Sequence, residues 1–261
     1  MNDGSEHGMD ATRFDAGEGP NIGAGGLGGA EGETTFEASL RQLKRRLIRE
    51  ATMATGMLEA ALRALWPLDA DAARAVRRDD DAIDMEEVAI ETACYELLAL
   101  HHPFARDFRV VTFILKVNSD IERMADHATS IAKVVIRISK LHPNTAPPKW
   151  PTALVELAQR VPAACHELLR SVLNEDVDGA RQIVLGDEVI DDLERQLFEE
   201  VVQLTRAERP SDEGLSVAML LYRIGRELER IGDLMKNIAE DVIYLSTGTI
   251  VRHEKRRLKQ S

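Results

Sequence analysis

The feature that most constrains the fold of this chain is an internal repeat. A shift of 107 residues lays the second half of the 261-residue sequence on the first, without a gap over a long stretch. Helical periodicity preserves hydrophobicity but not residue identity, so identical polar residues at one fixed offset indicate duplication of a single unit. The residues of the first copy that recur 107 positions later are Asp69, Asp71, Ala73, Arg74, Asp80, Ile83, Asp84, Glu87, Leu97, Pro103, Glu122, Arg123, Asp126, Ile131 and Ala132.

Each copy contains three helical stretches. Apolar residues recur every three or four positions along each stretch, which predicts one buried stripe per helix. Prolines separate most of the stretches, but Pro162 falls inside the fourth, where we expect a kink or a late start. The expected helices cover residues 36–65, 69–100, 104–141, 150–173, 176–206 and 211–247. We therefore predict an all-α protein of two tandem antiparallel three-helix bundles, residues 35–142 and 143–248.

The two ends of the chain differ from this helical body. Residues 1–34 hold 10 of the 17 glycines and seven acids, with almost nothing to bury, which predicts a disordered tail. Residues 249–261 form a basic C-terminal tail, with five Lys or Arg residues between positions 252 and 259. This tail is either a frayed helix end or a docking patch for an acidic partner or membrane surface.

Composition excludes several classes of function. A formal net charge of −12 disfavours nucleic acid and anionic membranes as partners. No apolar run approaches the roughly 18 residues of a membrane span, and the N-terminus lacks the layout of a signal peptide. The cysteines, Cys94 and Cys165, lie in helical patterns and form no CxxC pair, so we expect buried thiols. We expect a cytoplasmic protein that meets a membrane only through partners.

Acid pairs at four-residue spacing are the main candidate site. Such residues lie one turn apart on a single helix face, where two carboxylates repel each other unless a cation lies between them. Two helices that each present a pair would surround a hard cation with oxygen ligands, so the sequence predicts binding of Mg, Mn, Fe or Zn. The candidate residues are Asp80, Asp84, Glu122 and Asp126 in the first copy, and Asp187, Asp191, Glu229 and Asp233 in the second.

A simpler interpretation of these acid pairs stays open. Because 45 of the 261 residues are acidic, such pairs also occur on an ordinary solvated helix face. Arg123 and Arg230, which recur in both copies, could pair with these acids across one turn and take the place of a metal.

The sequence offers no recognisable catalytic apparatus, so we predict that the protein is not an enzyme. His127 follows the first acid pair but Leu234 follows its counterpart, so the Glu-x-x-His spacing of di-iron bundles is absent. No phosphate-binding glycine loop and no nucleophile beside a base can be recognised. His101 and His102 precede Pro103 without a copy in the second half, which favours a role at a helix end.

Two stretches around these acids resemble the signature of PhoU proteins. They are DIERMADH at 120–127 and ELERIGDLMKNIAE at 227–240, and residues 103–109 and 241–245 add to the resemblance, which covers about residues 36–255. The resemblance implies two three-helix bundles, each with a metal-binding patch, and often a homodimer. By position it implies Glu122, Asp126, Glu229 and Asp233 as ligands, with Asp80, Asp84, Asp187 and Asp191 as contributors.

The resemblance also implies a function. PhoU-like proteins restrain high-affinity phosphate import when phosphate is plentiful, by coupling a phosphate ABC transporter to a membrane sensor histidine kinase. The two copies are not equivalent for such a role, because Arg106 and Arg109 correspond to Glu213 and Ser216. A metal-storing or metal-sensing bundle and a metal-free scaffold are the alternative functions.

Overall fold

Six α-helices form the described part of the chain, which in this computed structural model is residues 29–141, 149–207 and 212–251. No strand occurs within these ranges, and the predicted all-α class is confirmed. Each predicted helix is present, and apart from the start of the first, every end lies within two residues of its expected position. The helices are α1 (Gly29–Leu65), α2 (Ala70–His101), α3 (Ala105–Leu141), α4 (Thr152–Asn174), α5 (Val177–Ala207) and α6 (Asp212–Thr247).

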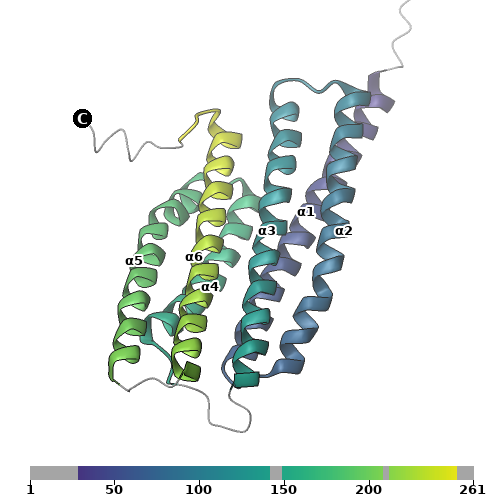
Figure 1. Cartoon of the computed structure of the whole chain (residues 1–261). Coiled ribbons are helices and arrows are strands. Elements are labelled where there is room, and N and C mark those ends of the chain that lie inside the picture. The colour runs from purple at the N-terminus through teal and green to yellow at the C-terminus, as the bar shows by residue number, and fades with distance from the viewer. Residues whose placement is uncertain (1–28, 142–148, 208–211, 252–261) are drawn as a thin grey trace, which may run out of the picture.

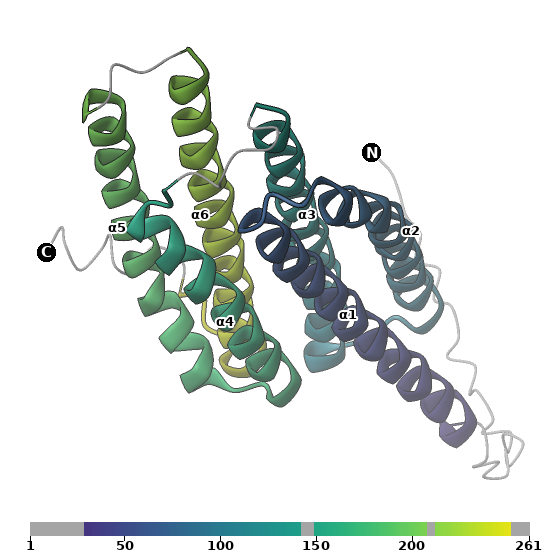
Figure 2. The same cartoon turned by 90° about the horizontal axis from the view of Figure 1, so that it is seen from below.

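The helices pack as two bundles of three, as the repeat predicts. Helices α1, α2 and α3 all contact one another, and so do α4, α5 and α6. The bundles lie side by side, with α3 against α6 and a smaller contact between α1 and α4 (Figures 1 and 2). Because α3 and α6 form the larger contact between the bundles and also pack against both other helices of their own bundle, they carry the largest sets of buried residues among the helices.

The helix boundaries explain part of the identity between the copies. Asp69 caps α2 by accepting hydrogen bonds of 2.9 Å from the backbone N–H groups of Asp71 and Ala72. Its counterpart Asp176 accepts equivalent bonds of 3.1 Å at the start of α5. An N-terminal cap of this kind stabilises a helix by about 1 kcal/mol. These two recurring acids therefore have a structural role.

The start of the first helix corrects the sequence prediction. Helix α1 begins at Gly29, so residues 29–34, expected in the disordered tail, are helical. Adding a residue to an existing helix is much easier than nucleating one, and no proline lies between Gly29 and the first expected helical residue. The rest of that tail, residues 1–28, lies outside the described residues. So do residues 252–261 of the basic tail and the expected bundle junction at 142–143.

Other expectations from the sequence concern proline, histidine and cysteine. Helix α4 starts at Thr152 and continues through Pro162 to Asn174, so it does not start late. His102 ends α2 in the left-handed conformation that often closes a helix, as expected of a helix-end residue. Both thiols are free and buried, and burial raises the pKa of Cys94 to about 11 and that of Cys165 to about 12.

Among the described residues, five ion pairs join the bundles. At the α3–α6 seam, Lys116 Nζ lies 2.6 Å from Oδ1 of Asp241, and His127 Nδ1 lies 2.7 Å from Oε2 of Glu227. Because residue numbers rise along α3 as they fall along α6 in these pairs, the two helices run antiparallel. Elsewhere, His166 of α4 contacts Glu59 of α1, and Glu175, which follows α4, contacts both Arg106 of α3 and Lys44 of α1.

None of the six described helices contains the long apolar stretch, nearly free of charged residues, that a bilayer span requires.

Candidate functional site

The first acidic patch consists of Asp80 and Asp84 on α2 with Glu122 and Asp126 on α3. The four predicted residues influence one another electrostatically, which places them together. Burial raises the pKa of Glu122, and the charges of Asp126 and Asp84 raise it further. Burial also raises the pKa of Asp80, although a hydrogen bond with Thr129 opposes this, and Asp126 and Asp84 add to the rise.

A fifth carboxylate, missed by sequence reasoning, lies behind this patch. Glu50 of α1 is fully buried, and neither of its carboxylate oxygens has a hydrogen-bond partner. Burial raises its pKa to about 8, and the neighbouring charges of Glu86, Glu87 and Glu122 contribute to the rise. Arg46, whose charge opposes the rise, is held by both carboxylate oxygens of Glu86. Glu50 therefore lies close enough to the first acidic patch to feel the charge of Glu122, and its own oxygens have no hydrogen-bond partner.

The sequence did contain a signal for Glu50. Leu43, Leu47, Ala54 and Leu58 are buried residues of the α1 stripe, and position 50 continues their three- or four-residue spacing. A carboxylate at such a position is rare, because burying an unpaired charge is costly. Glu50 does not recur in the second copy, where position 157 is leucine. It therefore does not stand out among the acids that are retained in both copies.

The second acidic patch consists of Asp187 and Asp191 on α5 with Glu229 and Asp233 on α6. These residues also come together. Burial raises the pKa of Asp191, helped by Asp187 and Asp233, and it raises that of Glu229, which Arg226 opposes. In this patch a lysine is bound directly to one of the acids: Lys236 of α6 donates a hydrogen bond to the buried carboxylate of Asp187.

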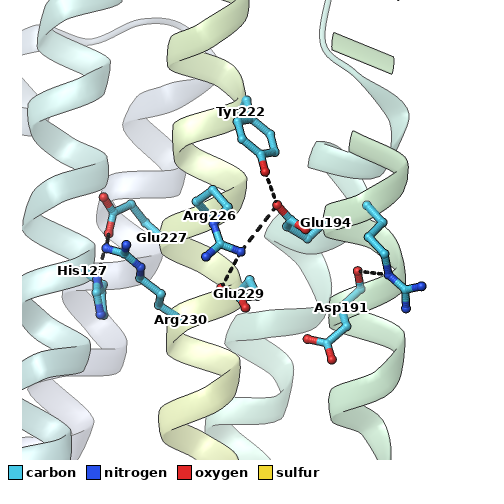
Figure 3. Close-up of polar contacts among 9 residues, drawn as sticks. His127, Asp191, Glu194, Tyr222, Arg226, Glu227, Glu229 and Arg230 are labelled. Carbon is cyan, nitrogen blue, oxygen red and sulfur yellow. Dashed lines mark hydrogen bonds and ion pairs between the residues drawn. The ribbon is translucent and has the colours of Figure 1, made fainter. Parts of the chain in front are cut away.

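A second cation lies on the other side of this patch. Arg226 Nη1 lies 3.2 Å from Oε2 of Glu229 and 3.6 Å from Oε1 of Glu194 (Figure 3). The hydroxyl of Tyr222 donates a 2.6 Å hydrogen bond to the same Glu194 oxygen (Figure 3). Glu194 and Glu229 therefore already share a cationic partner, Arg226, within the protein.

The repeated arginines do not pair with the predicted ligands. Arg123 lies 3.6 Å from Asp120, and Arg230 lies 3.9 Å from Glu227, three residues earlier in each case. The alternative in which these arginines neutralise the acid pairs is thus wrong for both copies. The buried Glu227 belongs instead to the seam between the bundles (Figure 3): burial acts to raise its pKa, but His127 and Arg230 outweigh that effect and lower it.

The two patches differ in how well they fit a hard cation. Such ions prefer carboxylate oxygens, and the first patch offers several, together with the unpartnered oxygens of Glu50. In the second patch the ammonium of Lys236 already lies on Asp187, at the place where a cation would be needed. Across the described ranges, no three Asp, Glu, His or Cys side chains are close enough together to hold a metal ion as they stand.

Comparison with known proteins agrees with the repeat and the fold. The sequence matches the PhoU domain twice, over residues 47–135 and 154–242, which start 107 positions apart. A protein of Deinococcus radiodurans described as a phosphate-specific transport system accessory protein PhoU homolog is 35% identical over 215 residues, covering 82% of this chain and 97% of that protein. A Pseudomonas aeruginosa homolog of the same description is 31% identical over 219 residues, covering 84% and 88%.

Solved structures show the same architecture. The crystal structure of the phosphate transport system regulatory protein PhoU from Streptococcus pneumoniae superposes with a TM-score of 0.74 at 30% identity, covering 83% of this chain and 99% of that one. The crystal structure of PhoU from Pseudomonas aeruginosa gives a TM-score of 0.75 at 29% identity, covering 82% and 100%. Two domain matches, full-length relatives and a shared architecture lead to one conclusion: the chain belongs to the PhoU family.

Proposed function

We propose that this protein is a negative regulator of phosphate uptake. One observation carries the proposal: both bundles match the PhoU domain, and relatives that align over most of their length are described as accessory proteins of a phosphate-specific transport system. In this proposal the protein is an adaptor at the cytoplasmic face of the membrane. It couples a phosphate ABC transporter to a sensor histidine kinase, so that import falls when phosphate is abundant.

The shape of the molecule supports an adaptor role. Ion pairs and helix packing fasten the bundles into one body, which leaves the outer helices α2 and α5 free to meet other proteins (Figure 1). Large apolar side chains are exposed on α2 and at the α2–α3 turn, and Phe104 is 84% exposed. Exposed apolar groups of this kind commonly mark a protein-binding surface. We propose that a transporter component, the kinase or a second copy of the chain covers them.

We further propose that a hard cation belongs to this function. Asp80, Asp84, Glu122 and Asp126, together with Glu50, would hold it in the first bundle. A bound Mg²⁺- or Mn²⁺-like ion would supply positive charge that cancels the repulsion among these carboxylates. Without such an ion, the like-charged side chains of the first acidic patch repel one another and move apart. This accounts for carboxylates that are neighbours but are not close enough together to hold an ion. The first bundle would then be more rigid with the cation bound than without it.

The regulatory role is tested by deleting the gene and measuring uptake of radiolabelled phosphate in medium with abundant phosphate. We expect uptake to stay high in the deletion strain, whereas the parent strain and a strain complemented with the wild-type gene reduce it. A deletion strain that reduces uptake as the parent does would contradict the proposed function.

A further inference from the structure

A pocket of about 240 Å³ lies between the two bundles, apart from both acidic patches. Its walls come from the four helices through which the bundles meet, α1 and α3 of the first bundle and α4 and α6 of the second. Ile48, Phe113, Leu173 and Leu245 each represent one of these helices. A molecule held in this pocket would therefore touch both bundles at once.

The wall of the pocket is mostly apolar. Apart from three charged residues, every described residue that lines it has an aliphatic or aromatic side chain. Leu47 and Ile114 are buried whereas Leu173 is exposed, so the pocket reaches from the core to the surface. Such a wall offers contacts to hydrocarbon rather than hydrogen bonds to water. Its volume equals that of about eight water molecules, and a methylene group is of similar size, so a chain of about eight carbons fits.

The charged residues of the pocket favour an anion. Lys44 and Arg45 of α1 contribute two positive charges, and Glu175 contributes one negative charge. Lys44 Nζ lies 3.4 Å from Oε1 of Glu175, and a guanidinium nitrogen of Arg106 lies 2.9 Å from Oε2 of the same carboxylate. Glu175 thus has two cationic partners already, while Arg45 forms no ion pair within 4 Å in the described part of the chain. In a chain with a net charge of −12, this local excess of positive charge attracts a negatively charged head group.

Charge also argues against the C-terminal tail of the chain as the occupant. Residues 252–261 follow α6 in the sequence and carry five Lys or Arg residues against one Glu. Lys44 and Arg45 would repel such a segment, since like charges at close range oppose each other. A separate anionic molecule fits the pocket better.

We propose that this pocket binds a small amphipathic anion, an aliphatic chain of about eight carbons that ends in a carboxylate. The chain lies against Phe113 and Leu245, and the carboxylate accepts hydrogen bonds from Arg45 and Lys44 at the surface. Because the walls belong to both bundles, the bound molecule stabilises the contact between them. Such binding goes beyond the proposed regulation of phosphate uptake, and it requires no metal ion.

Binding is measured on the full chain by isothermal titration calorimetry with sodium octanoate. Wild type is expected to bind one octanoate per chain. Each buried methylene group changes the affinity about fourfold, so butyrate should bind about a hundredfold more weakly or less. Octanamide has the same chain without the charge and should bind about tenfold more weakly than octanoate. Octanoate should also raise the unfolding temperature, as a ligand of the folded state does.

A change of one arginine tests the head-group contact. Arg45→Gln removes the cation that has no ion-pair partner, and it should weaken octanoate binding about tenfold. The matched control is Arg49→Gln, at an exposed arginine one turn later on α1 that does not line the pocket. This control should leave the affinity unchanged.

A change of one leucine tests the location of the site. Leu173→Asp places a negative charge at the edge of the pocket and should weaken octanoate binding at least about tenfold. The matched control is Leu185→Asp on α5, which should leave binding unchanged. Leu173 is 60% exposed and Leu185 is 53% exposed, so both variants are expected to fold, and circular dichroism checks this.

Three results would overturn the proposal. One is the absence of binding heat together with an unchanged unfolding temperature. Another is octanoate binding that neither Arg45→Gln nor Leu173→Asp weakens, because the ligand would then bind elsewhere. The third is octanamide binding as tight as that of octanoate, which would refute the anionic head group. Phosphate uptake in the deletion strain judges the proposed function separately, so the two failures can be told apart.

Discussion

Glu50 is a carboxylic acid at a core position of α1, and the free-energy cost of burying it depends on whether it is charged. Its pKa is raised from 4.5 to about 8 by burial and by neighbouring acids, so the folded protein keeps a proton that the unfolded chain releases. Between these two pH values the folded state binds more protons than the unfolded state. Stability of the metal-free protein should therefore fall as the pH rises from about 4.5 to about 8.

Glu50→Gln should remove much of this pH dependence, since glutamine stays neutral. With chelator present, we expect the variant to be more stable than wild type at pH 8 by about 2–4 kcal/mol, and nearly equal to it below pH 4.5. Urea denaturation at several pH values measures the difference. The control is Glu37→Gln, an exposed acid on the same helix, which should change little. A Glu50→Gln protein that is less stable than wild type at pH 8 would contradict the assignment.

At the scale of helices, two glycines on α6 lie close to α5, and we expect them to differ in how well they tolerate substitution by alanine. A Cβ at Gly225 would overlap Cδ2 of the fully buried Leu197, whereas a Cβ at Gly232 would lie 3.2 Å from two atoms of Ile190. The first copy has alanine at the position of Gly232, Ala125, so alanine is already accepted at an equivalent place.

Gly225→Ala should destabilise the second bundle by about 1–2 kcal/mol, because overpacking outweighs the gain in helix propensity. Gly232→Ala, the matched control, should be neutral or slightly stabilising for the same propensity reason. Thermal denaturation of both variants gives the comparison. Equal effects of the two substitutions would show that α5 and α6 do not approach each other as closely at Gly225 as described.

The helices themselves were predictable because their signals are local. Proline breakers and the apolar stripes fix where most elements begin and end. The extension of α1 back to Gly29 was not predictable, because it depends on continuing a helix through residues without an apolar pattern.

Only part of the candidate site could be predicted, because the comparison of the two copies reveals retained residues and not those that differ. Residues kept in both copies, such as Asp126 and Asp233, stand out in a comparison of the halves. Residues that differ between the copies, such as Glu50 and Lys236, do not stand out, although each changes the charge near its patch. The pairing of His127 with Glu227 depends on how the bundles meet, which no local pattern contains.

At the scale of the whole molecule, α3 and α6 each serve two purposes on different faces. Lys116 and His127 are eleven residues apart, which is about three turns, so they share the seam face of α3. Glu122 and Asp126 lie on another face, toward α2. One helix, α3, therefore carries both the first acidic patch and the seam with the second bundle.

Weakening the seam should lower the stability of the whole protein. Lys116→Met removes the partner 2.6 Å from Asp241, which is buried, and we expect a loss of about 1–3 kcal/mol because Lys116 itself is half exposed. Lys140→Met, at an exposed lysine near the end of the same helix, is the control and should change stability by about 0.5 kcal/mol or less. Urea denaturation followed by circular dichroism measures both, and equal losses would show that the seam pair contributes nothing.

Phosphate uptake in strains that carry patch variants at the native gene, grown with abundant phosphate, shows whether the first acidic patch is needed for the proposed regulation. We predict that Glu50→Gln combined with Asp126→Asn leaves uptake high, as a deletion does, whereas a strain with Asp233→Asn reduces uptake as wild type does. Protein levels must be equal in all strains. If the double variant reduces uptake as wild type does, the first acidic patch is not required for the proposed regulation.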